Sequence, residues 1–225
     1  MRSPHNITTK FLDRSFWLEE NAHYTKPHFR LEKCARIVNR LAGGKAYDLL
    51  DVGCGTATLE MLLDSNINYY GIDIAIHNPA PNLRETDFAK GKIGFENKTF
   101  DIVVAAGVFE YMGAEQRRKL DEIRSILKAN GRFVATYTNF HHVRSNSGYF
   151  PYNNVLPLKD FMADLQTFFH IINWFPSSHD RKVGPGPTRS WLKKINMVIN
   201  FNIPIFSNFF AVSYFFLCSV KNPSG

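Results

Sequence analysis

Apolar residues recur along this chain in two patterns that alternate. Between residues 27 and 41 they stand three and four positions apart, which predicts a helix with one buried face. Residues 47–53, 67–73 and 100–106 are short, mostly apolar runs, as is typical of buried parallel strands. Strands and helices that alternate in this way predict an open, mostly parallel α/β sheet. The other expected elements are helices at 56–63, 114–128 and 158–168 and strands at 82–86, 131–137, 169–175 and 212–221.

Glycines mark two of the predicted turns. Gly53 and Gly55 stand where a strand gives way to the expected helix at 56–63, so the free N–H groups of that helix's first turn are expected to face a ligand. Asn130-Gly131 predicts a left-handed turn before the strand at 131–137. Open α/β sheets bind ligands at the carboxyl ends of their central strands, which is where the first of these turns lies.

The glycine loop is not that of a dinucleotide-binding protein. The fingerprint G-x-G-x-x-G requires a third glycine, but Thr58 stands at that position. Asp51 lies two residues before Gly53, and a carboxylate so close would repel a pyrophosphate. The loop therefore favours a ligand with a cationic group and disfavours a nicotinamide cofactor.

Three further segments reach the same edge of the predicted sheet. Asp73 ends the second strand, where a carboxylate can accept hydrogen bonds from both hydroxyls of a ribose. Asp87 follows the third strand, where it and an adjacent amide can bind an adenine edge. The fourth strand leads into a loop that carries Tyr111. Four elements are thus expected to meet at one crevice.

Five short motifs occur in the order and spacing of a known family. They are D-x-G-C-G-T at 51–56, G-I-D at 71–73, T-D-F at 86–88, F-D-I-V-V at 100–104 and L-K-x-x-G-R-F at 127–133. With them, residues 47–137 resemble the class I S-adenosyl-L-methionine (SAM) methyltransferases of the small methyltransferase-domain type. One departure is Ala57, where family members commonly carry glycine, and it implies a slightly altered loop.

The resemblance implies a fold and an organisation. The fold is a Rossmann-like, seven-stranded, mostly parallel sheet with helices on both faces and an antiparallel C-terminal hairpin. The chain would be a single domain, 1–225, made of an N-terminal helical lid (1–45), a cofactor-binding core (46–140) and a substrate-side segment with the closing hairpin (141–225). The hairpin would contain an insertion at 176–211.

The resemblance also implies SAM as cofactor and assigns residues to it. The glycine loop and Asp51 would contact the amino-acid part, Asp73 the ribose, the T-D-F turn the adenine and the end of the fourth strand the methionine portion. The candidate cofactor-binding residues are Asp51, Gly53, Cys54, Gly55, Asp73, Ile74, Asp87, Phe88, Ala106 and Gly107.

Methyl transfer from a sulfonium needs alignment and exclusion of water, and a general base only when the nucleophile is a hydroxyl or a protonated amine. The candidate catalytic residues are Tyr111 and His141, and Tyr24, His28 and His142 are candidates for contact with substrate or for the lid. The competing interpretation is packing of the loop for Tyr111, packing of the lid for Tyr24 and His28, and an ordinary surface position for His141 and His142. No metal is expected, because the adjacent histidines lack ligand spacing and no C-x-x-C occurs.

Charge and hydropathy single out the C-terminal segment. The 225 residues include 27 Lys and Arg against 20 Asp and Glu, which gives a net charge of +7. Six basic residues and one acid lie in 177–225, and residues 195–220 carry no charge. Four asparagines and Pro204 in that run argue against a transmembrane helix. Basic and aromatic side chains at 189–210 would suit peripheral contact with an anionic membrane.

Three hypotheses of function follow. The first is a SAM-dependent methyltransferase that acts on an oxygen or nitrogen of a small-molecule acceptor. The second is a membrane-surface methyltransferase of a lipid or quinone, and the third is a SAM-binding protein without turnover. Nucleic acid is disfavoured as a partner, because no base-stacking or phosphate-tracking motif is evident. Residues 1–10 lack the apolar stretch of a signal peptide, so a cytoplasmic location is expected, and the oligomeric state stays open.

Overall fold

The chain folds around a sheet of seven strands in the order β3-β2-β1-β4-β5-β7-β6. The computed structural model describes residues 13–22, 25–95, 97–138, 156–177 and 213–221. Neighbours among β1 to β5 pair in parallel, whereas β7 runs antiparallel to both β5 and β6. The strands are β1 (Tyr47–Val52), β2 (Ile67–Asp73), β3 (Leu83–Glu85), β4 (Phe100–Ala106), β5 (Leu127–Thr138), β6 (Phe169–Ser177) and β7 (Ser213–Val220). The predicted fold, including its C-terminal hairpin, is confirmed.

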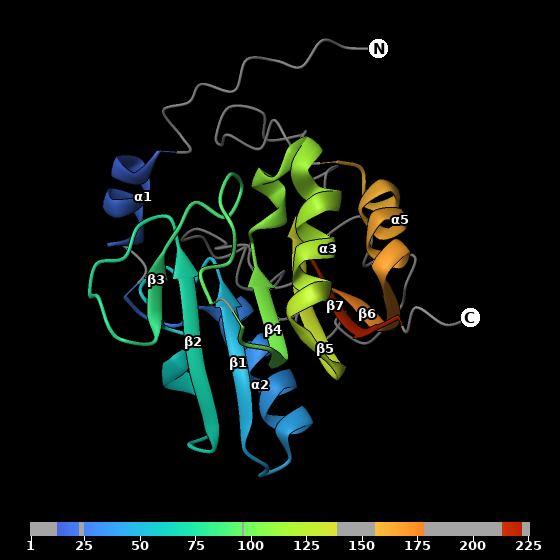
Figure 1. Cartoon of the computed structure of the whole chain (residues 1–225), viewed down its shortest axis with the longest axis horizontal. Coiled ribbons are helices and arrows are strands. Elements are labelled where there is room, and N and C mark those ends of the chain that lie inside the picture. The colour runs from blue at the N-terminus through green and yellow to red at the C-terminus, as the bar shows by residue number, and fades with distance from the viewer. Residues whose placement is uncertain (1–12, 23–24, 96, 139–155, 178–212, 222–225) are drawn as a thin grey trace, which may run out of the picture.

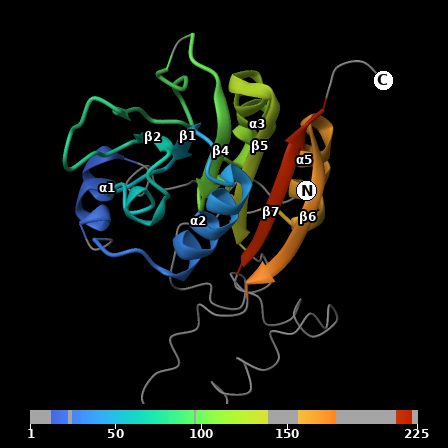
Figure 2. The same ribbon diagram turned by 90° about the horizontal axis from the view of Figure 1, so that it is seen from below.

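Helices cover both faces of this sheet (Figures 1 and 2). Helix α2 packs on one face through Cys34 and Val38, which meet Leu49 of β1 and Val104 of β4 in a buried apolar cluster. On the opposite face, α3 and α5 share a second cluster with β4, β5 and β7. Burial of apolar surface in these clusters is the main force that holds the layers together. The α-helices are α1 (Arg14–Asn21), α2 (Phe29–Ala42), α3 (Gln116–Ile126) and α5 (Leu158–Phe168).

The ends of α2 are defined by capping interactions. At the start, His28 Nδ1 accepts a hydrogen bond from the N–H of Arg30 at 3.2 Å. At the end, Gly43 takes a left-handed conformation with φ of 53°, and its N–H donates to Asn39 O at 3.0 Å. Both are common ways to satisfy the open hydrogen-bonding groups of helix ends. The helix therefore begins and ends close to the range that the apolar pattern predicts.

Two local predictions are wrong. The helix expected at 56–63 is replaced by turns and a short 3₁₀ segment at Glu60–Leu62, because Ala57 adopts a left-handed conformation with φ of 57°, which an α-helix cannot include. The turn expected at Asn130-Gly131 is also absent, since neither residue has a positive φ. Instead the chain passes from α3 directly into β5, whose pairing with β4 shifts register between Phe100 and Ile102.

The closing hairpin joins segments that are far apart in the sequence. Phe169 of β6 pairs with Val220 of β7 at one end, and Ser177 pairs with Ser213 at the other. The predicted insertion at 176–211 falls, apart from its first two residues, outside the residues that the structure describes. The predicted division of the chain at residues 45 and 140 remains a prediction. No helix among the described residues is long and apolar enough to cross a membrane.

Candidate functional site

A cavity of about 280 Å³ lies at the carboxyl ends of the central strands. Such a crevice is where open α/β sheets usually bind their ligands. The loops after β1, β2, β3 and β4 all line it, together with residues of α1 and of the first turn of α2. It brings together all ten candidate cofactor residues, Asp51, Gly53, Cys54, Gly55, Asp73, Ile74, Asp87, Phe88, Ala106 and Gly107.

The loop after β1 is held by hydrogen bonds to β2. The N–H groups of Gly53 and Cys54 both donate to Ile72 O, at 2.8 and 3.0 Å. The N–H of Gly55 donates to Asp73 Oδ2 at 2.8 Å. The amides of this loop are therefore bonded within the protein. The sequence had instead predicted free N–H groups at a helix N-terminus directly after the loop. Gly53 has φ of 74°, which glycine adopts without steric cost, so the loop presents a bare backbone to the cavity.

Ala57 stands at the one motif position where this chain departs from the family it resembles. Its φ of 57° is the left-handed conformation for which glycine is suited and which costs other L-residues roughly 1–2 kcal/mol. The departure therefore places backbone strain two residues beyond Gly55. The slight alteration of the loop that the sequence implies stays a prediction.

Asp51 is a buried acid in the wall of the cavity, with 2% of its surface exposed. The Tyr69 hydroxyl donates to its Oδ2 at 2.9 Å. Burial raises the pKa of Asp51 to about 7, in part opposed by the Tyr69 hydrogen bond and reinforced by the nearby charge of Asp73. Burial also raises the pKa of Asp73. Burial disfavours the ionised forms of both acids, and a cationic ligand beside them would stabilise those forms.

Asp73 also fastens helix α1 to the sheet. Its Oδ1 accepts hydrogen bonds from Asn21 Nδ2 at 3.3 Å and from the N–H of Ala75 at 3.0 Å. At the other end of α1, Arg14 pairs with Glu85 through Nε and Nη2, at 2.5 and 3.0 Å. Helix α1 consequently lies beside β3 at the rim of the cavity (Figure 1).

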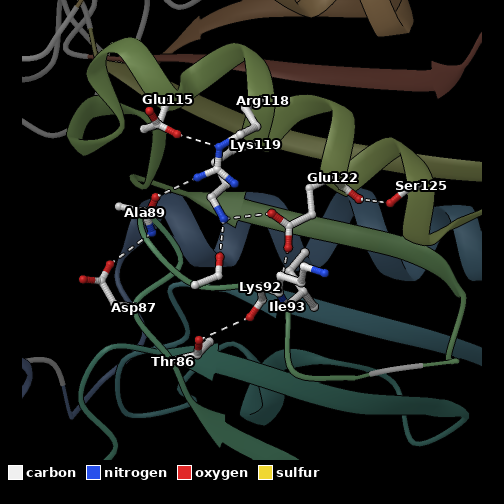
Figure 3. A network of polar contacts seen from close by, with 11 residues as sticks. Thr86, Asp87, Ala89, Lys92, Ile93, Glu115, Arg118, Lys119, Glu122 and Ser125 are labelled. Carbon is white, nitrogen blue, oxygen red and sulfur yellow. Dashed lines mark hydrogen bonds and ion pairs between the residues drawn. The ribbon is translucent and has the colours of Figure 1, made fainter.

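The loop after β3 supplies another wall of the cavity. Asp87 Oδ1 accepts from the N–H of Ala89 at 3.1 Å, and its Oδ2 pairs with Lys90 Nζ at 3.1 Å. Phe88 is 6% exposed, and the ammonium of Lys119 lies 4.5 Å from the centre of its ring. Figure 3 shows that the side chains reaching this loop come from α3.

The segment after β4 adds an aromatic and an acidic group. Tyr111 packs edge-on against Trp17 of α1, with ring centroids 5.2 Å apart, and both line the cavity. Glu110 is fully buried, and Thr138 Oγ1 donates to its Oε1 at 2.6 Å. Its Oε2 has no hydrogen-bond partner among the described residues. Burial raises the pKa of Glu110, in part opposed by the positive charge of Arg30.

Arg30 brings a positive charge to the cavity from the first turn of α2. Gly107 makes room for it, because a Cβ at this position would collide with Arg30 Nη1. The Nε of Arg30 is buried and has no partner within the described part of the chain. His28, a candidate for substrate contact, lines the cavity too, but its Nδ1 is engaged in capping α2.

Other predicted site residues lie outside the residues that the structure describes, so their roles remain predictions. They are Tyr24, His141 and His142. Within the described ranges, no group of three His, Cys, Asp or Glu side chains is arranged to hold a metal ion.

Asn21, Arg30 and Glu110 are residues of the cavity wall that were not among the site residues predicted from the sequence. Asn21 lies before the first helix that the apolar pattern predicts, and Arg30 lies within that helix, so neither position carried a signal for a ligand. Glu110 is different, because it is the single charged residue in the otherwise apolar run 108–112, and that signal could have been used. A charge within an apolar run is costly to bury and often marks a functional site.

Comparisons with known structures agree with this geometry. The N-methyltransferase NodS from Bradyrhizobium japonicum WM9, crystallised with S-adenosyl-L-homocysteine (SAH), matches with a TM-score of 0.56 at 14% identity, covering 92% of this chain and 97% of NodS. The plantazolicin methyltransferase BpumL, in complex with SAH and a monoazolic desmethylPZN analogue, matches with a TM-score of 0.63 at 15% identity, covering 97% and 95%.

A third structure covers the chain almost completely. It is the complex of the Trm112 methyltransferase activator of Haloferax volcanii with a methyltransferase, and it matches with a TM-score of 0.66 at 16% identity, covering 98% of this chain and 100% of that one. At such identities these likenesses establish the fold. No curated protein sequence matches the chain.

A family model described as "Methyltransferase domain" matches residues 27–178. The matched region runs from the cap of α2 to the end of β6, so it includes every loop that lines the cavity after β1, β2, β3 and β4. Because the match covers more than half of the chain, this protein belongs to the methyltransferase-domain family and is a class I methyltransferase that uses SAM as its methyl donor.

Proposed function

We propose that this enzyme transfers the methyl group to an oxygen or nitrogen of a small-molecule acceptor that enters beside Tyr111. The observation that carries the proposal is that the candidate cofactor residues and the Glu110–Tyr111 pair line one cavity of about 280 Å³. Ligand cavities usually measure about 300–1,000 Å³, so a cavity of about 280 Å³ has the scale of a small-molecule site.

The residues of the cavity fit SAM in charge. Asp51 is suited to its ammonium and Asp73 to a ribose hydroxyl. A carboxylate has about four lone-pair positions, and Asp73 already accepts from Gly55, Ala75 and Asn21, so about one position is left for the ribose. The guanidinium of Arg30 is suited to its carboxylate. When bound, SAM supplies a methyl group attached to a cationic sulfur, and this sulfur is a good leaving group. The protein has to bind SAM and the acceptor, align the acceptor atom with the methyl group, and exclude water from the site.

Glu110 supplies the group for proton transfer. Its Oε1 is held by Thr138, while Oε2 is the acceptor without a partner in the described structure. Because burial raises the pKa of Glu110, its carboxylate is a stronger base than a surface glutamate. In the proposed reaction Oε2 accepts the hydrogen bond of the acceptor O–H or N–H and takes the proton as the nucleophile forms its bond to carbon. Tyr111 and Trp17 form the aromatic wall that orients the acceptor.

A labelled-methyl screen tests the acceptor class. Metabolite extracts are incubated with the enzyme and SAM that carries a labelled methyl group, and the label is followed into small-molecule, lipid, protein and nucleic-acid fractions. The proposal expects label in the small-molecule fraction, on oxygen or nitrogen. Label in the lipid fraction would instead favour the membrane-surface hypothesis, and label on carbon or in a macromolecule would contradict the proposal. Segment 189–210, on which peripheral membrane contact depends, lies outside the described residues, and a cytoplasmic location stays a prediction.

Two variants separate cofactor binding from proton transfer. Asp73→Ala is expected to weaken SAH binding roughly 10- to 100-fold, because hydrogen bonds to a charged group contribute about 1.5–3 kcal/mol each. Glu110→Gln is expected to leave SAH binding within about twofold while it lowers the rate with the identified acceptor and flattens its pH dependence. Calorimetry and steady-state rates measure the two effects, with Asp121→Asn on the exposed face of α3 as the control.

A further inference from the structure

Residues 86–93, the loop that follows β3, carry two candidate cofactor residues but no helix or strand of their own. Residues 86–90 line the cavity, and the main chain at Ala89, Gly91 and Ile93 is bound by side chains of α3. A loop of this kind has to be held by its surroundings if its side chains are to keep one position. Helix α3 does so with three successive side-chain contacts (Figure 3).

Lys119 makes the central contact. Its side chain is 0% exposed, which is rare for a lysine and costly unless the charge is paired. The Nζ donates to Gly91 O and to Glu122 Oε2, the latter at 2.8 Å, and lies over the ring of Phe88 at 4.5 Å from its centre. One ammonium therefore joins the main chain of the loop, a side chain of α3 and the aromatic ring in the cavity wall.

Two neighbours on α3 complete the arrangement. Glu122 Oε1 accepts a hydrogen bond from the N–H of Ile93 at 2.7 Å. Arg118 Nη2 donates to Ala89 O at 3.2 Å, while its Nε pairs with Glu115 at 2.6 Å. The helix thus binds the loop at Ala89, Gly91 and Ile93. We call Arg118, Lys119 and Glu122 the α3 clamp.

The chemistry of the clamp exceeds what packing alone requires. An apolar side chain at position 119 would fill the same buried space without a charge to neutralise, and such replacements are often neutral or stabilising. Hydrogen bonds to main-chain groups fix direction and register, which apolar contacts do not. The ion pair is therefore suited to positioning the loop rather than to raising stability.

We propose that Lys119 is a positioning residue for the cofactor: the α3 clamp holds the loop at 86–93 so that Phe88 and Asp87 face the adenine end of SAM. The proposal rests on the proposed binding of SAM in this cavity and on the adenine contact that the family resemblance implies for this loop. It adds a second layer to the cofactor site, formed by a helix that carries none of the five family motifs.

The main test is the double variant Lys119→Met/Glu122→Gln, with SAH as the probe. Removing both charges leaves no unpaired buried ion, and the amide oxygen introduced by Glu122→Gln can still accept the hydrogen bond from the N–H of Ile93. The melting temperature is therefore expected to stay near that of the wild type. Calorimetry is expected to show SAH binding weakened at least 10-fold. Amide hydrogen exchange of residues 86–93 is expected to accelerate with SAH absent, while exchange elsewhere stays unchanged.

A second arm and a control keep the outcomes distinct. Arg118→Met removes a half-exposed side chain, leaves no buried charge and is expected to weaken SAH binding about threefold. Arg124→Met, on the same helix but paired with Asp121, is expected to bind SAH like the wild type. Unchanged SAH binding in both clamp variants would overturn the positioning role, and so would a loss of affinity in Arg124→Met equal to theirs. Failure of the wild type to bind SAH would overturn the cofactor assignment and this proposal together.

Discussion

Two loops that line the cofactor cavity are held in different ways. The glycine loop at 53–57 depends on its own backbone, because Gly53, Gly55 and Ala57 take positive φ and its amides bond to β2. The loop at 86–93 depends on side chains of a distant helix, the α3 clamp. The buried acids Asp51 and Asp73 lie beside the first loop, whereas a buried lysine, Lys119, lies beside the second.

This difference explains where a substitution will be tolerated. In the glycine loop, a Cβ added to one of the glycines would strain the backbone of the loop itself. In the loop at 86–93, the decisive residues lie far away in the sequence, as the separation of 28 between Gly91 and Lys119 shows. The first loop should therefore be sensitive to added atoms and the second to lost charges.

Gly53→Ala should give the largest effect. A Cβ there would lie 2.6 Å from Val108 Cγ2 and would sit on a residue with φ of 74°. Left-handed strain of about 1–2 kcal/mol and overpacking of about 1–3 kcal/mol predict a loss of roughly 2–5 kcal/mol in the free energy of unfolding. Thermal unfolding and SAH calorimetry measure it, and SAH binding is expected to be lost.

Gly44→Ala is the matched control for that substitution. Gly44 has φ of 80° but nothing within 4 Å of the added Cβ, so it carries the strain without the collision and lies outside the cavity. It should lower stability by only about 1–2 kcal/mol and leave SAH affinity unchanged. Equal losses in the two variants would show that the glycine loop has no special dependence on close approach.

Asp51→Asn should produce opposite changes in stability and binding. It removes a carboxyl whose ionisation is opposed by burial, so at pH 8 the protein without cofactor is expected to become more stable, by an amount on the order of a few kcal/mol. SAH affinity should fall about 10- to 100-fold, because the ammonium loses its charged partner. Thermal unfolding and calorimetry at pH 8 test both, and a variant that lost stability would contradict the account of the buried acid.

The same carboxyl predicts a pH dependence of known sign. The pKa of Asp51 is about 7 in the folded protein and about 3.8 in the unfolded chain, so the folded state binds the proton more tightly. Its contribution is fully present below about pH 4 and is lost as the pH rises to about 7. The stability difference between Asp51→Asn and the wild type should therefore grow over this interval and level off above it. SAH affinity of the wild type should rise over the same interval, with protons released on binding.

Ala57→Gly should have the smallest effect. It removes roughly 1–2 kcal/mol of left-handed strain but adds chain entropy of about 0.5–1 kcal/mol to the unfolded state, so a gain of about 0.5–1 kcal/mol is expected. That corresponds to a rise of about 1–4 °C in melting temperature. Ala163→Gly, on the exposed face of α5, should instead lower stability by about 1 kcal/mol. A loss of stability in both would mean that Ala57 carries no strain.

The glycine loop and its acids were predictable from the sequence because their information is local. Asp51, Gly53 and Asp73 lie at the ends of strands that the apolar pattern defines, and parallel strands bring such ends together. The strands were predicted to within a few residues for the same reason. The conformation of Ala57 was not, because it depends on how the chain leaves the loop and not on the identity of the residue.

The clamp could not be found in this way, and of the acceptor side only Tyr111 and the isolated charge of Glu110 leave a local signal. Lys119 and Arg118 fall within a helix whose polar residues normally face solvent, and only the packing of α3 over the loop at 86–93 shows that one of them is buried. Glu110 and Arg30 come from segments far apart in the sequence and meet only in the folded chain. Side chains that meet only in the folded structure have no fixed spacing in the sequence, so no sequence motif identifies them.

The position of β7 between β5 and β6 has a consequence for biosynthesis. β6 ends at Ser177, and the strand that pairs with it begins only at Ser213 and ends at Val220. During translation, at about 5–20 residues per second, a completed β6 therefore waits some seconds for its only strand neighbour in the described sheet. In that interval the unpaired backbone of β6 is exposed together with the side chains of Ile172 and Trp174. An exposed apolar strand edge of this kind is a site for chaperone binding and for aggregation. The nascent chain thus keeps this strand edge open until β7 emerges, long after the cofactor loops have been made.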